Sequence, residues 1–561
     1  MRRARLLQGF VALSVLAVVA AACTGGGNET TTGPTGETTP SSGSTSGGPT
    51  AGGTMTVAAA VDVVTLDNSQ AVSTIDYSLT AGALYEGLYH VDTQGELVPA
   101  LAEDLPEISD DGLTYTITMR EGAMFAGPGF EPRAVTADDA AYGMLRALSP
   151  DTKPGPSWGG GYLYGIEGAP EFAAGEADDV SGINVVDDRT LEITLSAPAS
   201  SFLYSLTIAT SWPVPREAVE ADEEGFGDNP VGAGPFSLES WDKGSGLVLA
   251  RNPGYVDPTY PYLDAIDVSL NVDPNTQALQ LSDGSLDAIA EPFFLSQAVI
   301  QQLSSDPNVT MTPTTGPTVY YWALNNEGVL ADPALRGAVA QAISKDFIAQ
   351  FGGVAEPWNQ IYASVTKQSD TSVQGYAYDA DTAEAALADA GYDGSTLKVI
   401  YDATDPFAEA MSTSLKQDLE AIGVSVDIKG LQQAAYFGGQ GYNDPSNYDL
   451  LPTYWREDYP DGQDFISTNF VCAQVAPPGL NVARYCSDTV DSMLAQSDAL
   501  PFGEERDTLL KQIQQQVIQD AAAVPMMQVN WPAIYGANVG ALPTIPTYAP
   551  FDWKSAWVKQ A

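Results

Sequence analysis

The stretch LKVIYDATDPFAEAMSTSLKQDLEAIGVSVDI, residues 397–428, carries the clearest fold signal in the chain. Residues 397–401 are short and apolar, as in a buried strand. The Asp-Pro pair at 405–406 is typical of a helix start, because Asp caps free N–H groups and Pro fits the first helical position. The helix ends near Gly423, and residues 424–428 then alternate as a second strand. We therefore predict a strand–helix–strand unit with two parallel strands.

The segments on either side extend this α/β pattern. Upstream, Asp379 is placed to cap a helix that stops at Gly391. Downstream, residues 448–454 form an apolar strand candidate, in which Pro452 favours an edge or strand-end position. Ligands of open parallel sheets bind beyond the carboxyl ends of strands, so we expect the following segment, 455–461, at a crevice.

Other local patterns in the first half indicate short strands and turns. Residues 113–119 alternate like a half-buried strand, and Thr136 is placed to cap a helix that runs through Leu148. Residues 232–238 and 247–251 are expected to pair as a hairpin around the turn sequence Asp-Lys-Gly.

The composition indicates a large folded chain with a very acidic surface. The 561 residues exceed the size at which one hydrophobic core stops growing, so two or three domains are expected. Hydrophobic residues make up 44% of the chain, which excludes disorder for most of it. With 72 acidic and 23 basic residues the formal net charge is -49, so we expect no nucleic acid partner and no peripheral membrane binding. The acidity either steers cationic ligands or simply keeps the protein soluble.

The N-terminus has the pattern of an exported lipoprotein. Residues 1–22 combine a basic start with an apolar run that is short for a membrane span. The sequence Ala-Ala-Ala-Cys ending at Cys23 resembles a lipobox, which predicts lipid attachment at Cys23; the alternative is a plain signal peptide followed by an accidental cysteine. Residues 23–53 are almost entirely Gly, Ser, Thr and Pro and are predicted to be a flexible tether.

The remaining two cysteines, Cys472 and Cys486, are predicted to form a disulfide, because an exported chain folds in an oxidising compartment. A metal site or a nucleophilic thiol is the weaker alternative. The chain has one histidine, His90, and none of the common metal or nucleophile motifs, so we expect no metal, no cofactor and no enzyme activity.

Eight stretches in the same order resemble family 5 extracellular solute-binding proteins, the receptors of ABC importers for oligopeptides, dipeptides and nickel complexes. The stretch nearest the C-terminus is YWREDYPDGQDF, in which Asp461-Gly462 stands where the family usually has Asp-Pro. The matching stretches are residues 97–125, 135–148, 231–241, 251–257, 281–289, 324–346, 378–392 and 454–465.

The resemblance implies a type II periplasmic-binding-protein-like fold, α/β and bilobed, with an extra small domain and two mixed-sheet lobes joined by a hinge. It implies a monomer on the outer face of the cytoplasmic membrane or in the periplasm, working with an ABC permease and ATPase. The expected division is signal peptide 1–22, tether 23–53, lobe 1 at 54–315 with a small inserted domain at about 88–190, lobe 2 at 316–529, and a return to lobe 1 at 530–561.

The resemblance also nominates binding residues. Asp458 falls on the position that pairs with the ligand's α-amino group in peptide-binding members, and Trp455 and Tyr459 flank it. Trp322 lies where the chain crosses between lobes; its alternative is strand core, and core packing is also the alternative for Trp455. Arg456 and Glu457 are expected to be solvated or paired.

A peptide is the first expectation for the ligand. A sugar, a cationic small molecule or a metal chelate stays open as the alternative. Two other classes of protein also remain open: a secreted hydrolase that uses paired carboxylates, and a surface adhesin lipoprotein.

Overall fold

The structure is a computed structural model of the chain, and it describes residues 48–560 except 313–317, 439–440, 478, 531 and 548–550. The predicted signal peptide, Cys23 and the tether up to residue 47 lie outside the described residues. Within these ranges no helix has both the length and the apolar character that crossing a bilayer requires.

The first large sheet has seven strands in the order β12-β19-β11-β1-β10-β9-β8. β1 is parallel to β10 and β11, whereas β9 is antiparallel to both β8 and β10, so the sheet is mixed. The predicted hairpin is present as β8 and β9. The strands are β1 (Thr54–Ala58), β8 (Phe236–Asp242), β9 (Gly246–Arg251), β10 (Ala265–Ser269), β11 (Ala288–Ile289), β12 (Val309–Thr312) and β19 (Ala533–Gly536). Helices α6 (Pro274–Asp283) and α7 (Gln297–Ser304) pack against the β12 end of this sheet.

A four-stranded antiparallel sheet extends the same body. Its order is β4-β5-β7-β6, from β4 (Glu107–Ile108), β5 (Thr114–Thr118), β6 (Ile183–Asp187) and β7 (Thr190–Thr194). Helix α2 (Ala137–Leu148) lies against it and starts with a capping box between Thr136 and Asp139, as predicted for Thr136. Buried residues of this sheet and of the seven-stranded sheet share one continuous core, and we call this part the first lobe.

The second large sheet has six strands in the order β14-β18-β13-β17-β15-β16, and we call the part built on it the second lobe. β15 is parallel to β16 and β17, whereas β13 is antiparallel to β17 and β18. The strands are β13 (Thr318–Leu324), β14 (Ala355–Pro357), β15 (Leu397–Asp402), β16 (Val426–Leu431), β17 (Leu450–Arg456) and β18 (Ala523–Val529). The expected pair of mixed sheets is therefore present.

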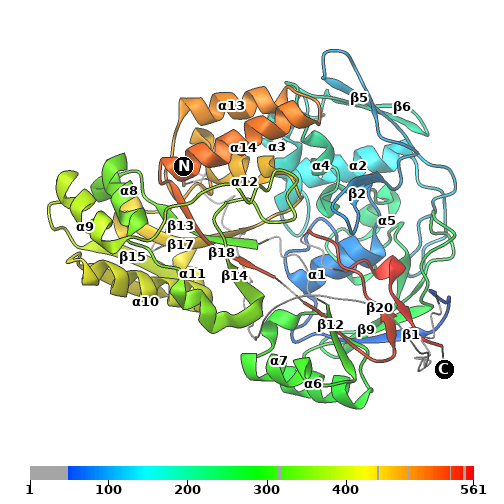
Figure 1. Cartoon of the computed structure of the whole chain (residues 1–561). Coiled ribbons are helices and arrows are strands. Elements are labelled where there is room, and N and C mark those ends of the chain that lie inside the picture. The colour runs from blue at the N-terminus through cyan, green and yellow to red at the C-terminus, as the bar shows by residue number, and fades with distance from the viewer. Residues whose placement is uncertain are drawn as a thin grey trace, which may run out of the picture.

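The central strand β13 explains how the second lobe is layered. All 7 of its residues are buried, and successive side chains enter different cores because side chains alternate across a strand. Tyr320 and Trp322 lie in one core with α8 (Pro333–Gln341), α9 (Ala380–Asp389) and α10 (Pro406–Ala421). Tyr321 lies in the other with α12 (Gly462–Asn469), α13 (Asp488–Asp498) and α14 (Glu504–Gln519). In Figure 1 the first helix group lies at the left and the second at the top.

The predicted strand–helix–strand unit is confirmed as β15-α10-β16. The Asp405 carboxylate accepts the backbone N–H groups of Phe407 (2.9 Å) and Ala408 (3.3 Å), as an N-cap does. Beyond the helix end, Gly423 has φ +81°, a conformation that glycine adopts without strain. Asp379 likewise caps α9 by accepting from Thr382 N–H at 2.9 Å.

The expectation that Pro452 marks an edge holds for the second half of the strand: β17 lies between β13 and β15 in the sheet, but β15 pairs with it only at Leu450. Pro452 pairs opposite Trp322 on β13, while the ladder to β15 reaches β17 at Leu450. The carbonyl of Pro452 accepts the Tyr436 hydroxyl at 3.2 Å instead of a strand neighbour. An imide nitrogen is tolerated here because the β15 ladder has already ended.

Cys472 and Cys486 form a disulfide in the structure, 14 residues apart in sequence. A crosslink that closes a loop of this length should contribute about 3 kcal/mol to the free energy of unfolding by restricting the unfolded chain. We predict that thiol titration of the unreduced, denatured mature protein finds neither cysteine free. Two reactive thiols at these positions would show that the native protein carries no such crosslink.

Candidate functional site

The segment after β17 is fixed at its far end by a buried ion pair. The Asp461 carboxylate accepts both guanidinium N–H groups of Arg506 at 2.6 and 2.7 Å, and both side chains are fully buried. Asp461 also caps α12 by accepting the backbone N–H of Gln463 at 3.0 Å. A bidentate pair of this kind sets both the position and the direction of the chain that enters α12.

Gly462, the departure from the family's usual Asp-Pro, has a physical reason in this chain. Its backbone N–H donates to Gln368 Oε1 at 2.8 Å, a bond that proline cannot make. A Cβ at this position would lie 2.6 Å from Cζ of the Tyr362 ring, which is too close for any larger residue. The glycine therefore lets the Tyr362 ring pack directly on the start of α12.

Asp458 lies beyond the carboxyl end of β17 and contacts the other lobe. Its carboxylate accepts the hydroxyl of Tyr162, which comes from the short helix Trp158–Leu163 of the first lobe. Burial raises the pKa of the Asp458 carboxyl to about 6, against the opposing effects of the Tyr162 hydrogen bond and the nearby Arg456 charge. The predicted anchor is therefore a partly buried acid at the boundary between the lobes.

A second carboxylate, Asp464 on the first turn of α12, supports the same segment. Its Oδ2 accepts the indole N–H of Trp455 at 2.8 Å and the backbone N–H of Asp458 at 3.2 Å. Asp464 is fully buried, and its Oδ1 has no hydrogen-bond partner among the described residues. Burial, followed by the charge of Asp458, raises the pKa of Asp464 well above its ordinary range.

Tyr459 belongs to an aromatic cluster that joins the lobes. Its ring stacks on Tyr204 with a centroid distance of 5.1 Å and an interplanar angle of 5°, and it meets the Tyr162 ring edge-on at 6.3 Å. Tyr204 lies on α4 (Phe202–Ser205) of the first lobe. The Tyr459 hydroxyl donates to Gln463 Oε1 at 2.6 Å, so the polar end of this buried ring is satisfied.

Two polar contacts join the lobes beside this cluster. Lys367 Nζ lies 2.8 Å from the carboxylate of Glu96, and the backbone N–H of Ser200 donates to the carbonyl of Asp498 at 2.9 Å. The segment that contains Asp458 and Tyr459 is therefore held at the contact between the lobes, beyond the end of β17.

The expectation that Glu457 is solvated is wrong. Its side chain is fully buried and accepts the Thr366 hydroxyl and the Ala363 backbone N–H, the latter at 3.2 Å. Burial raises the pKa of Glu457 to about 8. Successive residues of this segment face opposite sides, so Glu457 turns into the second lobe while Asp458 turns toward the first.

Trp322 is a strand-core residue, which is the alternative that the sequence left open. It is fully buried in the β13 core with Phe407 and Leu450, and it belongs to a different core from Trp455. We therefore leave Trp322 out of the site.

Sequence reasoning missed Tyr162, Tyr204 and Asp464. Asp464 stands inside the quoted 454–465 motif, six residues after Asp458, and counting acidic residues along that motif would have nominated it. Tyr162 follows three glycines in a short helix whose sequence has no periodic pattern, so its contact with a residue 296 positions away has no local signal.

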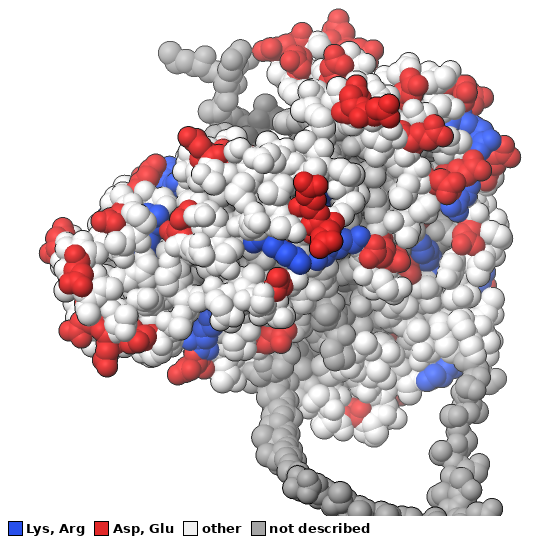
Figure 2. All heavy atoms as spheres, turned by 45° about the horizontal axis from the view of Figure 1, so that its top comes forward, with Lys and Arg blue, Asp and Glu red and all other residues white. Residues whose placement is uncertain are grey.

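The surface carries the charge that the composition predicts. On the face shown in Figure 2, Asp and Glu are spread widely and Lys and Arg are few. No group of three or more His, Cys, Asp or Glu in the described part of the chain is placed to hold a metal ion.

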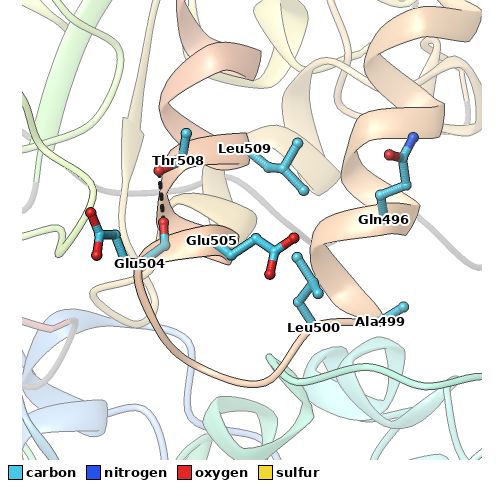
Figure 3. Close-up of a pocket in the computed structure, with 7 residues that line it drawn as sticks. All are labelled: Gln496, Ala499, Leu500, Glu504, Glu505, Thr508 and Leu509. Carbon is cyan, nitrogen blue, oxygen red and sulfur yellow. Dashed lines mark hydrogen bonds between the residues drawn. The ribbon is translucent and has the colours of Figure 1, made fainter.

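A separate open hollow of about 700 Å³ lies where α13 ends and α14 begins (Figure 3). It is lined by Leu500 and Leu509 together with Glu504 and Glu505, and the Thr508 hydroxyl donates to the Glu504 carbonyl at 2.7 Å. All of its lining residues come from the second lobe, so it is distinct from the contact between the lobes.

Comparison with known proteins matches this chain to one family along most of its length. The model of bacterial extracellular solute-binding proteins, family 5 middle, matches residues 96–477. The glutathione-binding protein GsiB of Salmonella paratyphi A is 27% identical over 491 residues, which cover 86% of this chain and 90% of the relative. GsiB of Escherichia coli is 26% identical with the same coverage.

Solved structures show the same fold. HbpA2 from Haemophilus parasuis superposes with a TM-score of 0.80 at 20% identity, covering 91% of this chain and 100% of that one. DppA from Helicobacter pylori, solved with the peptide STSA, gives a TM-score of 0.72 at 22% identity, covering 91% and 99%. These likenesses confirm the bilobed periplasmic-binding-protein fold. The chain belongs to the bacterial extracellular solute-binding proteins of family 5, the solute-binding proteins of ABC importers.

Proposed function

We propose that this protein captures a short peptide between its two lobes by the peptide's free amino terminus and delivers it to an ABC permease. The observation that carries the proposal is Asp458, a partly buried acid beyond a strand end that also touches the opposite lobe. Glutathione-binding relatives, whose ligand is a peptide, support it. The relatives are binding proteins, and we propose that this chain is likewise a monomeric receptor and not an enzyme.

The chemistry of the segment favours a cation over a neutral sugar. Asp458 and Asp464 lie together, while Arg506, the nearby buried cation, is already paired with Asp461. The attraction between an ammonium group and each carboxylate strengthens once water is excluded, because the local dielectric falls. Trp455 adds an aromatic wall that can face a cation.

We propose the lobe boundaries 54–315 with 530–561 for the first lobe and 316–529 for the second. The strand membership of the sheets supports this division, since β1 to β12 and β19 serve the first lobe and β13 to β18 the second. The chain then crosses between the lobes before β13 and after β18, where a hinge would lie.

A receptor that closes on its ligand should become more compact and more stable. We predict that saturating glutathione or trialanine lowers the radius of gyration measured by small-angle scattering, and that the melting temperature rises with ligand concentration by linkage. N-acetylated trialanine is the matched control and should do neither. A rise in melting temperature without a fall in the radius of gyration would indicate a rigid module and contradict closure on the ligand.

We also propose that Cys23 carries the lipid anchor after cleavage behind Ala22. Acyl chains bind the bilayer with about 0.8 kcal/mol for each buried methylene, so the anchor alone should hold the protein at the membrane. Cys23→Ala should move the protein from the membrane fraction to the soluble fraction. A variant that stays with the membrane would show that the attachment lies elsewhere.

A further inference from the structure

The Asp458–Asp464 pair has a feature that amine binding by Asp458 alone does not explain. Asp464 is completely buried, yet one of its carboxylate oxygens, Oδ1, meets no donor in the described residues. Its other oxygen is held at 2.8 Å by Trp455 and at 3.2 Å by the N–H of Asp458, so the carboxyl faces the binding segment. An unpaired buried carboxylate is costly, and such groups normally take up a proton or meet a cation.

The surroundings supply mostly further negative charge. The negative charge of Asp464 raises the pKa of the Tyr162 and Tyr459 hydroxyls. The negative charges of Asp458 and Glu457 raise the pKa of Asp464 in turn, so they favour its neutral form. The positive charge of Arg456 lowers the pKa of Asp458, and Arg506 donates to the Asp461 carboxylate. The titratable and charged groups next to the pair are Tyr162, Arg456, Glu457 and Tyr459, and Asp461 and Asp498 act in turn on the Tyr459 hydroxyl.

We propose that Asp464 is a second anchor for the ligand's ammonium, protonated in the free receptor and ionised when the ammonium binds between it and Asp458. This inference rests on the proposed function and deepens it, since it names the ligand group as a primary ammonium with hydrogens for two carboxylates. The proton leaves Asp464 for solvent as the positive charge arrives, so the charge of the closed site changes little. Binding then tightens by up to about tenfold for each pH unit while the free receptor holds that proton.

The test is the number of protons released on binding. Calorimetric titration with trialanine and with glutathione at pH 7.0, in buffers of different ionisation enthalpy, should give about one more proton released by the wild type than by Asp464→Asn. The amide can still accept from Trp455, so the variant should bind, more weakly and with a flatter pH dependence. Asp393→Asn removes an acid from an exposed turn of the second lobe, and it should release as many protons as the wild type. Equal proton release by the wild type and Asp464→Asn would overturn the proposal.

A measurement without ligand separates this proposal from the proposed function. The infrared difference spectrum of wild type minus Asp464→Asn at pH 7.0 should contain the C=O stretch of a neutral carboxylic acid, and saturating trialanine should remove it. Lack of that band in the free receptor would overturn the proposal even if both peptides bind. If neither peptide binds, the proposed function and ammonium-linked release both fall, while the band still decides whether Asp464 holds a proton.

Discussion

Replacing Asp458 by Asn should weaken binding of a free-amine peptide by about 2–5 kcal/mol, which is roughly thirty-fold to several-thousand-fold in affinity. The amide keeps the shape of the side chain and can still accept the Tyr162 hydroxyl, but it loses the charge that an ammonium needs. Calorimetric titration of both proteins with trialanine and with its N-acetylated form measures the effect. The variant should lose affinity for the free amine and change little toward the acetylated peptide.

The control for this variant is Asp393→Asn, which removes one acidic charge from an exposed turn of the second lobe. Exposed charges separated by more than a Debye length are screened, so this change should leave the affinity almost unaltered. If Asp458→Asn binds the free peptide as tightly as the wild type does, Asp458 serves only the contact with Tyr162. The peptide assignment would then lose its main support.

Arg506→Met should destabilise the protein by about 3–5 kcal/mol, because it leaves the Asp461 carboxylate buried without its cation. That is a large share of the total free energy of unfolding of an ordinary domain, about 5–15 kcal/mol. Urea denaturation followed by tryptophan fluorescence measures the change. The double variant Asp461→Asn with Arg506→Met removes both charges and should recover part of the loss.

Lys243→Met provides the comparison for an ion pair in solvent. Lys243 contacts Asp228 at 2.5 Å, but the two side chains are 58% and 52% exposed. Exposed pairs contribute about 0–1 kcal/mol, so this variant should unfold close to the wild type. Similar losses for Arg506→Met and Lys243→Met would show that burial of the Asp461 pair adds nothing.

Local patterns predicted the parts of the fold whose causes are local. The Asp405 cap, the turn at Gly423 and the alternation that follows lie within one short stretch, and each is present in the structure. The Thr136 capping box and the β8-β9 hairpin were predictable for the same reason.

The parts that could not be predicted depend on partners far along the chain. The strand neighbours of β17 could not be predicted, because nothing near Pro452 shows that β13 pairs along the whole strand while the β15 ladder stops at Leu450. The sequence around Glu457 is that of a surface acid, because the two residues that donate hydrogen bonds to its carboxylate, Ala363 and Thr366, lie over 90 residues earlier in the chain.

The residues of the site also differ in whether the sequence could predict them. Asp458 and its motif could be found from the sequence, because the motif is contiguous and resembles a known family. The lobe contact at Tyr162 and the role of Arg506 could not, because both require three-dimensional closure of long loops.

Native mass spectrometry of the protein purified from its own cells tests the central claim most directly. The intact protein should carry an added mass that is released on unfolding and that fragments as a peptide with a free amino terminus. A released molecule without a cationic group, such as a neutral sugar, would contradict an ammonium anchor at Asp458.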